Sequence, residues 1–275
     1  MTGCSGAGES LPRVSVLAGG KRPAPVDLLP QMCSHFASTL KKPRKRLRLQ
    51  CPHTQSVDVL SYPQVNDGAI SSHFRAYKHG VFHQDISDEI AMVHKSEGVA
   101  CGCLVDWDLA FSSEHQVERE TTDPSIRRGT SPFLAIDLQS VTLNGRLLPL
   151  SHRYCHDLEA LFWLLLWAVI HFDIPNNRRL PCRVPKWGKG ATADVATFKH
   201  CVLTAANTRQ GVLDLALPIH EDIVERWVVP LAAMFKKARS DAEDIDERKR
   251  CFFNVELYAK GATFEKFMET IRRRP

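Results

Sequence analysis

The densest apolar run in the chain, LFWLLLWAVI from Leu161 to Ile170, decides most of what this sequence can fold into. Together with the residues around it, HDLEALFWLLLWAVIHF, it predicts a helix that is apolar on nearly every side. A membrane-spanning helix needs roughly twenty apolar residues, whereas this run has ten and is followed by His171 and Asp173. We therefore expect a helix that is buried in a core supplied by the rest of the chain.

Length and composition are those of an ordinary globular protein. The 275 residues suit one domain, or one domain with a tail, and 44% of them are hydrophobic and 24% charged. Residues 1–55 are rich in Gly, Ser and Pro, so we expect a largely disordered tail there, with at most a short helix around Leu28–Leu40. Residues 56–275 are expected to form the domain.

Basic residues are concentrated in the segment KKPRKRLR, which carries six of them. The net charge of the whole chain is +5, so the remainder is close to neutral. A dense basic cluster in a flexible tail is typical of a nuclear-import signal, although a contact with nucleic acid or anionic lipid, or a solvated tail, has the same composition. The candidate import residues are Lys41, Lys42, Arg44, Lys45, Arg46 and Arg48.

Nothing in the sequence points to secretion. The start, MTGCSGAGES, lacks the basic head and apolar stretch of a secretory signal, and the nine cysteines are scattered without a C-x-x-C pair. We expect an intracellular protein with reduced cysteines and no membrane contact, nuclear if the import signal is used and otherwise cytoplasmic.

Hydrophobic spacing predicts the remaining elements of the domain. They are a helix over residues 65–77 that stops at Gly80, two short strands in IAMV and CGCLVDWDLA, an amphipathic helix over residues 223–235 kinked at Pro230, and a terminal helix over Phe264–Arg272.

Four motifs are more specific in their order than singly. HQDIS, LVDWDLA, RRGTSPFLAIDL and HRYCHDLEALFWLLLWAV follow one another as motifs do in the C-terminal lobe of a eukaryotic protein kinase. They resemble H-R-D-I-S, L-I-D-F-D-L-A, R-T-G-T-x-P-F-M-A-I and H-x-x-x-H-D-L-E-S of the fungal-type protein kinase domain. The resemblance covers about residues 60–240. It implies a mainly α (α+β) fold, the kinase-like helical C-terminal lobe, with a short β-hairpin at the catalytic cleft.

The resemblance also implies an activity. Phosphoryl transfer to a hydroxyl requires a carboxylate beside that hydroxyl and oxygen ligands that hold Mg²⁺ against the phosphates of ATP. Asp85 would have the first role and Asp106 would be the metal ligand. Their separation of twenty-one residues leaves room for one β-hairpin, which would bring both carboxylates to one cleft. The implied substrate is a hydroxyl group of a protein.

Other residues receive supporting roles from the family pattern. His83 would pack beneath the catalytic loop, and Asp157 would open the buried helix and accept hydrogen bonds from the loop backbone. Asp157 is also interpretable as a helix N-cap, with Glu159 in the first turn, where the helix dipole favours an acidic residue. The remaining assignments are a substrate-side loop of Gly129, Thr130 and Pro132, with Arg127 and Arg128 beside it, candidate phosphorylation sites at Thr121, Thr122 and Ser125, and a turn residue at Asp108.

Three departures from the pattern bear on activity. Ile90 stands where the family has an asparagine that binds the second metal ion, so Asp88 or Glu89 would have to replace it. Gln84 replaces the arginine that pairs with a phosphorylated activation segment. No G-x-G-x-x-G followed by V-A-I-K is found, so the N-terminal lobe is expected to be missing or degenerate.

Three functions follow from this pattern. The first is a serine/threonine-type protein kinase domain that requires ATP and Mg²⁺ and is impaired in transfer. The second is a catalytically inactive, pseudokinase-type interaction or scaffold module with a protein partner and no cofactor. The third is a truncated kinase fragment. The sequence does not separate the second from the third, and it predicts no oligomeric state.

Overall fold

The computed structural model describes residues 63–96, 99–107, 110–112, 129–140, 142–143, 146–147, 152–173, 176, 178–184, 187, 192–245 and 251–272. These residues all fall within one compact unit, Arg46–Pro275. The tail expected over residues 1–55, its short helix, the candidate import residues and the expected domain boundary lie outside the described residues.

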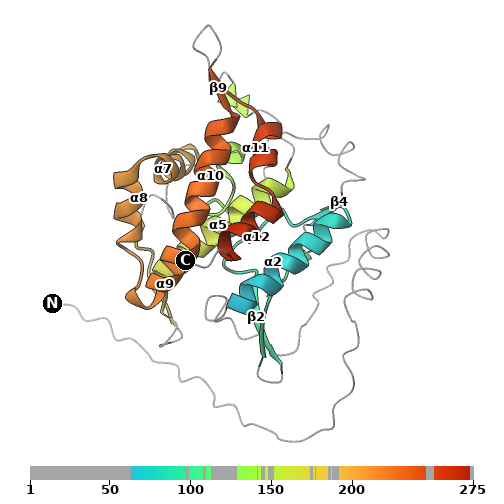
Figure 1. The fold of residues 1–275 in the computed structure, drawn as a ribbon, viewed down its shortest axis with the longest axis vertical. Helices are drawn as coiled ribbons and strands as arrows, with labels where there is room; N and C mark the ends of the chain where they lie inside the picture. Colours follow the sequence, from blue (N-terminus) through green and yellow to red (C-terminus); the bar gives the residue numbers. More distant parts are fainter. Residues whose placement is uncertain are drawn as a thin grey trace, which may run out of the picture. The chain divides into compact units, whose positions relative to one another are not determined.

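The described part of the chain is mainly helical (Figure 1). Its helices are α2 (Pro63–Lys78), α4 (Ile136–Ser140), α5 (Tyr154–His171), α7 (Thr192–Thr204), α8 (Ala206–Leu213), η3 (Pro218–His220), α9 (Glu221–Ile223), η4 (Val224–Val228), α10 (Val229–Ala242), α11 (Val255–Gly261) and α12 (Phe264–Arg272). The terminal helix has the bounds expected from the sequence, and the first helix begins two residues before the expected periodic stretch.

Each described strand pairs with one antiparallel neighbour, so no larger sheet forms among the described residues. The pairs are β1 (Val81–Phe82) with β4 (Phe111–Ser112), β2 (Ala91–Ser96) with β3 (Val99–Leu104), β5 (Thr142–Leu143) with β6 (Arg146–Leu147), β7 (Phe172–Asp173) with β8 (Arg178–Arg179), and β9 (Glu243–Ile245) with β10 (Cys251–Phe253).

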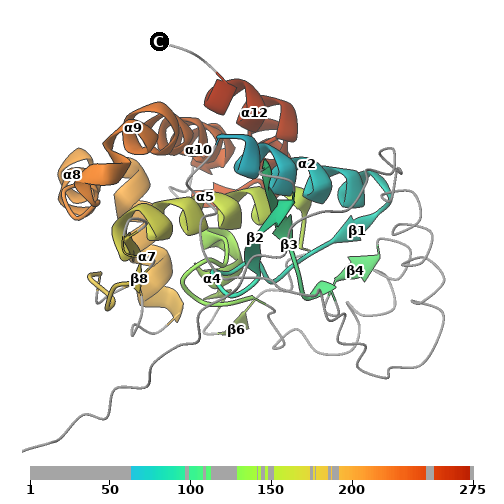
Figure 2. The same ribbon diagram turned by 90° about the horizontal axis from the view of Figure 1, so that it is seen from below.

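The buried helix expected from the apolar run is α5. All of its residues are buried except Leu165, which confirms the prediction of a core helix. Its aromatic rings pack against other elements: Phe162 lies 5.3 Å from Phe235 of α10, and Trp167 lies 5.7 Å from Phe133, both measured between ring centroids. Figure 2 shows α5 running through the middle of the helices.

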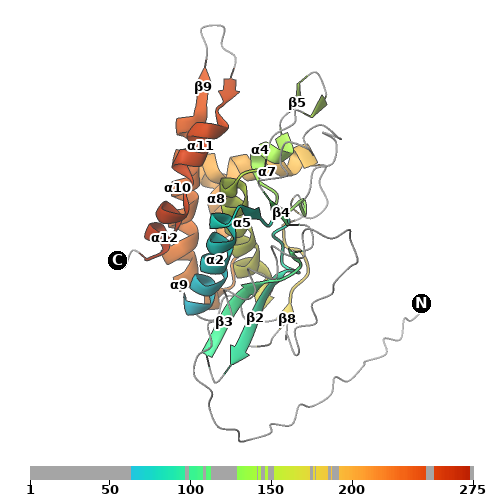
Figure 3. The same ribbon diagram turned by 90° about the vertical axis from the view of Figure 1, so that its right-hand side faces the viewer.

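The hairpin expected between Asp85 and Asp106 is β2–β3, which projects from the helices in Figure 3. Its register pairs Ala91 with Leu104 at the base. The pairing continues beyond the strands, because the backbone N–H of Val105 donates to the carbonyl of Ile90 over 3.0 Å. The two ends of the hairpin, Ile90 and Val105, therefore lie side by side, and Asp106 follows directly after the second end.

The amphipathic helix expected over residues 223–235 consists of three pieces. A π-helical turn, η4, separates α9 from α10, and Pro230 lies in the first turn of α10. Proline has no N–H to donate to the preceding turn, and a wider π turn is one way in which a helix accommodates this loss. The irregularity thus lies at Val224–Val228, in the turn before Pro230, and the kink expected at Pro230 itself stays a prediction.

Two helical glycines give a matched test of packing at α10. A Cβ on Gly261 of α11 would lie 2.7 Å from the Cβ and 2.9 Å from the Cα of Ala238 in α10, whereas a Cβ on Gly211 of α8 would meet no atom within 4 Å. We expect Gly261→Ala to lower the free energy of unfolding by about 1–3 kcal/mol, since the two helices must separate. Gly211→Ala should raise it by about 0.4–1 kcal/mol. Urea denaturation measures both; similar effects in the two variants would contradict close packing of α10 on α11.

None of the helices in the described part of the chain is both long and apolar enough to cross a membrane.

Candidate functional site

Asp157, in the first turn of α5, is the residue around which the loop His83–Asp85 is arranged. Its carboxylate is 1% exposed and accepts the backbone N–H groups of His83 and Gln84 over 3.0 Å and 3.2 Å. It also accepts hydrogen bonds from Nε2 of His73 and Nε2 of His152, over 2.9 Å and 2.7 Å. Four donors converge on one buried carboxylate, so both of its oxygens are occupied.

The environment of Asp157 keeps it ionised. Burial alone would raise its pKa, but the charge and hydrogen bond of His152, with those of His73, hold the pKa well below the ordinary value for aspartate. A carboxylate in this position can therefore fix the backbone of the loop at neutral pH.

The loop needs this support because its backbone is strained. Gln84 has φ = +67°, a left-handed conformation that residues other than glycine rarely adopt. Such a residue costs about 1–3 kcal/mol and persists only where the surroundings determine it. Its own N–H donates to Asp157, so the hydrogen bond and the strain lie at the same residue.

His83 joins this loop to the one that carries Asp106. Its ring is fully buried, and because a carbonyl only accepts, its Nε2–H must donate to the oxygen of Val105, 3.0 Å away. Trp107 packs edge-on against the ring, with centroids 4.6 Å apart. Burial lowers the pKa of His83, so the ring is neutral at pH 7. This geometry is that of a structural side chain.

Asp106, the residue assigned to the metal, is exposed and also has a left-handed backbone, with φ = +60°. An exposed carboxylate offers the hard oxygen ligand that Mg²⁺ prefers. However, no group of three or more His, Cys, Asp or Glu lies close enough to hold a metal ion within the ranges that the structure describes. The role of Asp106 stays a prediction.

Asp85 is brought together with the substrate-side loop. The hydroxyl of Thr130 donates to Oδ1 of Asp85 over 2.9 Å. Gly129, with φ = +122°, lets the two segments approach: a Cβ there would lie 2.7 Å from Cδ1 of Leu134 and 3.3 Å from the carbonyl oxygen of Gln84. The hydroxyl of Thr130 therefore lies beside Asp85, the carboxylate that would orient the substrate hydroxyl according to the resemblance.

Pro132 is the third residue assigned to that loop. Its carbonyl accepts the indole N–H of Trp187 over 2.5 Å, and Trp187 is buried. This hydrogen bond holds the loop at Pro132. Pro132 has no contact with Asp85 of its own among the described interactions.

The segment after Asp85 differs from the metal-binding pattern. Ile90 is 6% exposed and belongs to the hydrophobic core, and Glu89 is exposed. Asp88 forms an ion pair with Arg179 of β8, with 2.5 Å between Oδ2 and Nη2. The side chain at position 90 thus packs, and the nearest carboxylate is already paired with a cation.

Several residues assigned from the sequence cannot be located. Those outside the described residues are Asp108, Thr121, Thr122, Ser125, Arg127 and Arg128.

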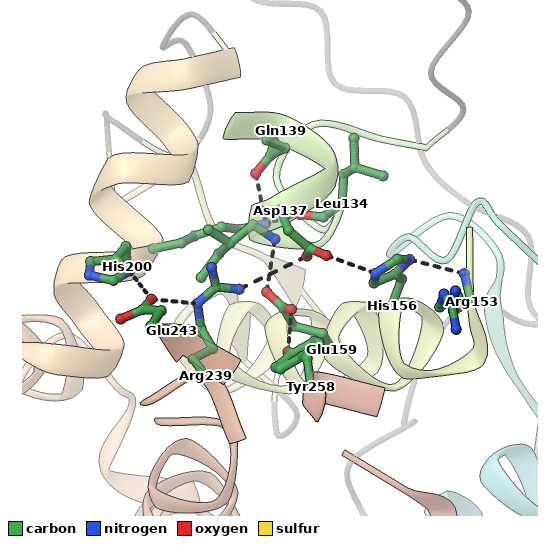
Figure 4. A network of polar contacts seen from close by, with 12 residues as sticks. Leu134, Asp137, Gln139, Arg153, His156, Glu159, His200, Arg239, Glu243 and Tyr258 are labelled. Atoms are coloured by element: carbon green, nitrogen blue, oxygen red, sulfur yellow. Dashed lines mark hydrogen bonds and ion pairs between the residues drawn. The ribbon is translucent and has the colours of Figure 1, made fainter. Parts of the chain in front are cut away.

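Behind the substrate-side loop lies a second set of buried polar side chains, which the sequence did not predict (Figure 4). Asp137 of α4 accepts Nε2–H of His156, 2.9 Å away, while Nδ1 of His156 accepts the backbone N–H of Arg153. Nη1 of Arg239 in α10 lies 3.9 Å from Asp137. Burial raises the pKa of Asp137, but His156 and Arg239 lower it more, to about 2.

Glu159 is the centre of this set. It is fully buried, and accepts the backbone N–H of Ile136, the indole N–H of Trp163 and the hydroxyl of Tyr258 over 2.9, 2.9 and 2.5 Å. The interpretation of Asp157 as the helix N-cap with Glu159 in the first turn is wrong, because α5 begins at Tyr154 after the N-cap Arg153, which places Asp157 in the first turn and Glu159 beyond it. The Glu159 carboxylate bridges α5 to α4 and α11. Its position in a motif with apolar neighbours was the signal that could have indicated burial.

Lys199 of α7 completes the set. Its ammonium group is buried, donates to the carbonyl of Leu134 over 2.6 Å and lies 3.4 Å from Oε1 of Gln139. Burial lowers its pKa to about 7, against the opposing attraction of Glu159. The substrate-side loop and α4 are therefore held through polar contacts to three further helices: α5, α7 and α10.

These observations define a class of protein: a mainly helical domain in which a buried helix fixes a carboxylate-bearing loop against a threonine-bearing one. Residues 64–169 match the family model described as fungal protein kinase. The match confirms the resemblance seen in the four motifs and runs from α2 into α5. No curated protein matches the chain.

Proposed function

We propose that this chain is a protein-kinase-type phosphotransfer domain whose hydroxyl-binding side is assembled and whose metal-binding side is reduced. The observation that carries the proposal is the hydrogen bond of Thr130 to Asp85, 2.9 Å long, on a loop that Asp157 holds. This bond supports the proposal because it orients the Asp85 carboxylate, which in the proposed role would accept the proton of a substrate hydroxyl.

The proposed reaction is the transfer of the γ-phosphoryl group of ATP to a serine or threonine of a protein. The substrate oxygen forms a bond to the γ-phosphorus, the bond from that phosphorus to the bridging oxygen breaks, ADP leaves, and the hydroxyl proton passes to Asp85. Thr130 fixes the carboxylate through Oδ1, and Gly129 keeps the two loops in contact. The match of residues 64–169 to the fungal protein kinase family model supports this class of reaction.

The residues present fit Mg²⁺ only in part. Asp106 is the residue that would hold it, because its carboxylate is exposed beside the loop that His83 connects to Asp85. Bound Mg²⁺ would neutralise charge on the phosphates. Ile90 supplies no ligand, and Asp88 is paired with Arg179. We therefore expect slow transfer, with weak dependence on any second metal ion.

Transfer of labelled phosphate from Mg²⁺-ATP to an acceptor protein such as casein tests the proposal. We expect Asp85→Asn to reduce the rate about 10²- to 10⁴-fold, since a positioned proton acceptor is lost. Asp106→Asn should abolish the stabilisation of the chain by Mg²⁺-ATP in a thermal shift measurement. The matched control is Asp241→Asn, an exposed aspartate on α10 that forms an ion pair with Lys237.

Unchanged transfer in Asp85→Asn would refute the assigned role. If millimolar Mg²⁺-ATP neither stabilises the wild type nor supports transfer, the chain is instead an interaction module without catalysis. That second function is favoured by one specific observation: Ile90 fills the core at the position of the missing metal ligand.

A further inference from the structure

A second surface lies beside the proposed phosphotransfer loop, at the C-terminal end of α5. Figures 2 and 3 both show β8 there. The strand pair β7–β8 matches Phe172 with Arg179 and Asp173 with Arg178. Immediately afterwards the backbone N–H of Leu180 donates to the carbonyl of His171 over 2.7 Å. The segment that carries Arg178 and Arg179 is thus held against the end of the core helix.

His171 holds the next part of the segment. Its Nδ1–H donates to the carbonyl of Trp167 over 2.8 Å, so the unprotonated Nε2 is free to accept the backbone N–H of Arg183 over 3.0 Å. Burial lowers the pKa of His171, with the charges of Arg179 and Arg183 acting in the same direction. The guanidinium of Arg183 donates to the carbonyl of Leu215 over 2.8 Å. Both ends of the segment are therefore fixed before any partner binds.

The ion pair of Arg179 with Asp88 places this segment beside the loop of Asp85. Asp88 follows Asp85 by three residues, and its side chain is 7% exposed, whereas that of Arg179 is 51% exposed. The guanidinium of Arg179 also lies 5.9 Å from the ring centroid of Trp167. Arg179 can thus hold Asp88 on one side and present its remaining donors to solvent.

The charge of this region is one-sided. From Ile174 to Ala193 the sequence has five basic residues and no acidic one. The carboxylates that face the arginines belong to Asp88 and to Asp173, which lies 3.4 Å from Arg178. The side chain of Arg178 is nevertheless 65% exposed, and Arg183 is exposed and bonds to a carbonyl instead of a carboxylate.

We propose that Arg178, Arg179 and Arg183 form a docking surface for an acidic stretch of a protein partner. Guanidinium groups recognise carboxylates through paired, parallel hydrogen bonds, and groups fixed in advance lose little entropy on binding. A stretch of glutamates or aspartates docked here runs past Asp85, so serines and threonines near acidic residues are the substrate class that fits. The docking itself does not depend on phosphoryl transfer, and an inactive chain would use the same surface to hold a partner.

A protein segment fits this surface better than a nucleic acid. Single-stranded nucleic acid is bound by basic grooves that include exposed aromatic rings for stacking. Here Trp167 and Trp187 are buried, and two carboxylates lie among the three arginines. Such a mixed, compact arrangement suits a few side-chain carboxylates, whereas a long row of phosphates requires unbroken positive charge.

The test is a binding measurement with the full chain and a fluorescent peptide of six glutamates around one serine. A peptide with lysine in place of every glutamate is the negative control, and polyuridylate and phosphatidylserine vesicles are probed in parallel. We expect the glutamate peptide to bind, and Arg178→Glu with Arg183→Glu to weaken binding about 10-fold or more, since repulsion replaces attraction. Arg178→Lys retains the positive charge, so it should weaken binding of the glutamate peptide less than Arg178→Glu does.

The matched control is Arg226→Glu, because Arg226 of η4 is also an exposed arginine in an ion pair with an aspartate, Asp222, and is not one of the three arginines of the proposed surface. Equal weakening by the control would overturn the proposal, as would tighter binding of polyuridylate or vesicles through the same arginines, or no peptide binding at millimolar concentration. Arg178→Glu alone, at a 65% exposed side chain, serves if the double variant does not fold. Repeating the measurement in Asp85→Asn separates the two proposals: docking is retained there even if transfer is lost.

Discussion

Replacing Asp157 by alanine is expected to lower the free energy of unfolding by about 3–5 kcal/mol, because a buried, charged acceptor is removed from donors that stay behind. The backbone N–H groups of His83 and Gln84 and the Nε2 atom of His73 would lose their acceptor inside the protein. Whole domains are stable by only about 5–15 kcal/mol. Urea denaturation followed by tryptophan fluorescence measures the loss.

The effect of Asp157 should also depend on pH. Its pKa is lower in the folded protein than its ordinary value, so the stabilisation is fully present above about pH 4 and is lost as the pH falls further. Between neutral pH and pH 4 the difference in the free energy of unfolding between Asp157→Ala and the wild type should stay constant. Asp241→Ala, at an exposed ion pair with Lys237, is the control and should change stability little. A loss for Asp157→Ala no larger than for this control would show that the loop is held by other contacts.

The second large effect is expected for Lys199→Met, and it appears as a change in pH dependence. With a folded pKa of about 7, Lys199 is mostly neutral at pH 9, whereas in the unfolded chain it stays protonated up to about pH 10. The unfolded state therefore binds more protons in this window, so wild-type stability rises with pH, by up to about 1.4 kcal/mol per unit. The methionine variant lacks this contribution.

Urea midpoints at pH 7, 8 and 9 measure the prediction. The free energy of unfolding of Lys199→Met, relative to that of the wild type, should increase as the pH falls from 9 to 7, because methionine avoids a buried charge. Lys237→Met, at a 76% exposed side chain, should leave the difference independent of pH. Parallel curves for wild type and Lys199→Met would mean that the ammonium group stays charged, held by Leu134 and Glu159.

Local patterns predicted α2, α5, the stretch from α9 to α10, and α12, but not α4, α7, α8 or α11. The terminal helix Phe264–Arg272 and the buried helix α5 follow from apolar spacing alone. The hairpin β2–β3 also follows from neighbouring residues, since its strands are close in the chain. Family motifs then directed attention to Asp85, Asp106 and Asp157.

The contacts that surround these residues could not be predicted from sequence spacing or motifs. Asp88 is paired with Arg179, and Glu159 bonds to Tyr258, 99 residues further on. A carboxylate looks the same in sequence whether it faces solvent or the core. Only the packing of α4, α7, α10 and α11 around α5 decides which, and no local pattern encodes that packing.

The dependence of the loop on Asp157 has a consequence for how the chain is made. Asp157 lies 74 residues after His83, so at ordinary rates of about 5–20 residues per second the ribosome adds it roughly 4–15 s later. Until then the carboxylate that accepts the N–H of Gln84, the residue with the positive φ, is absent. The segment that carries Asp85 therefore leaves the ribosome as an unstrained loop, and acquires its final shape only when α5 arrives to complete the core.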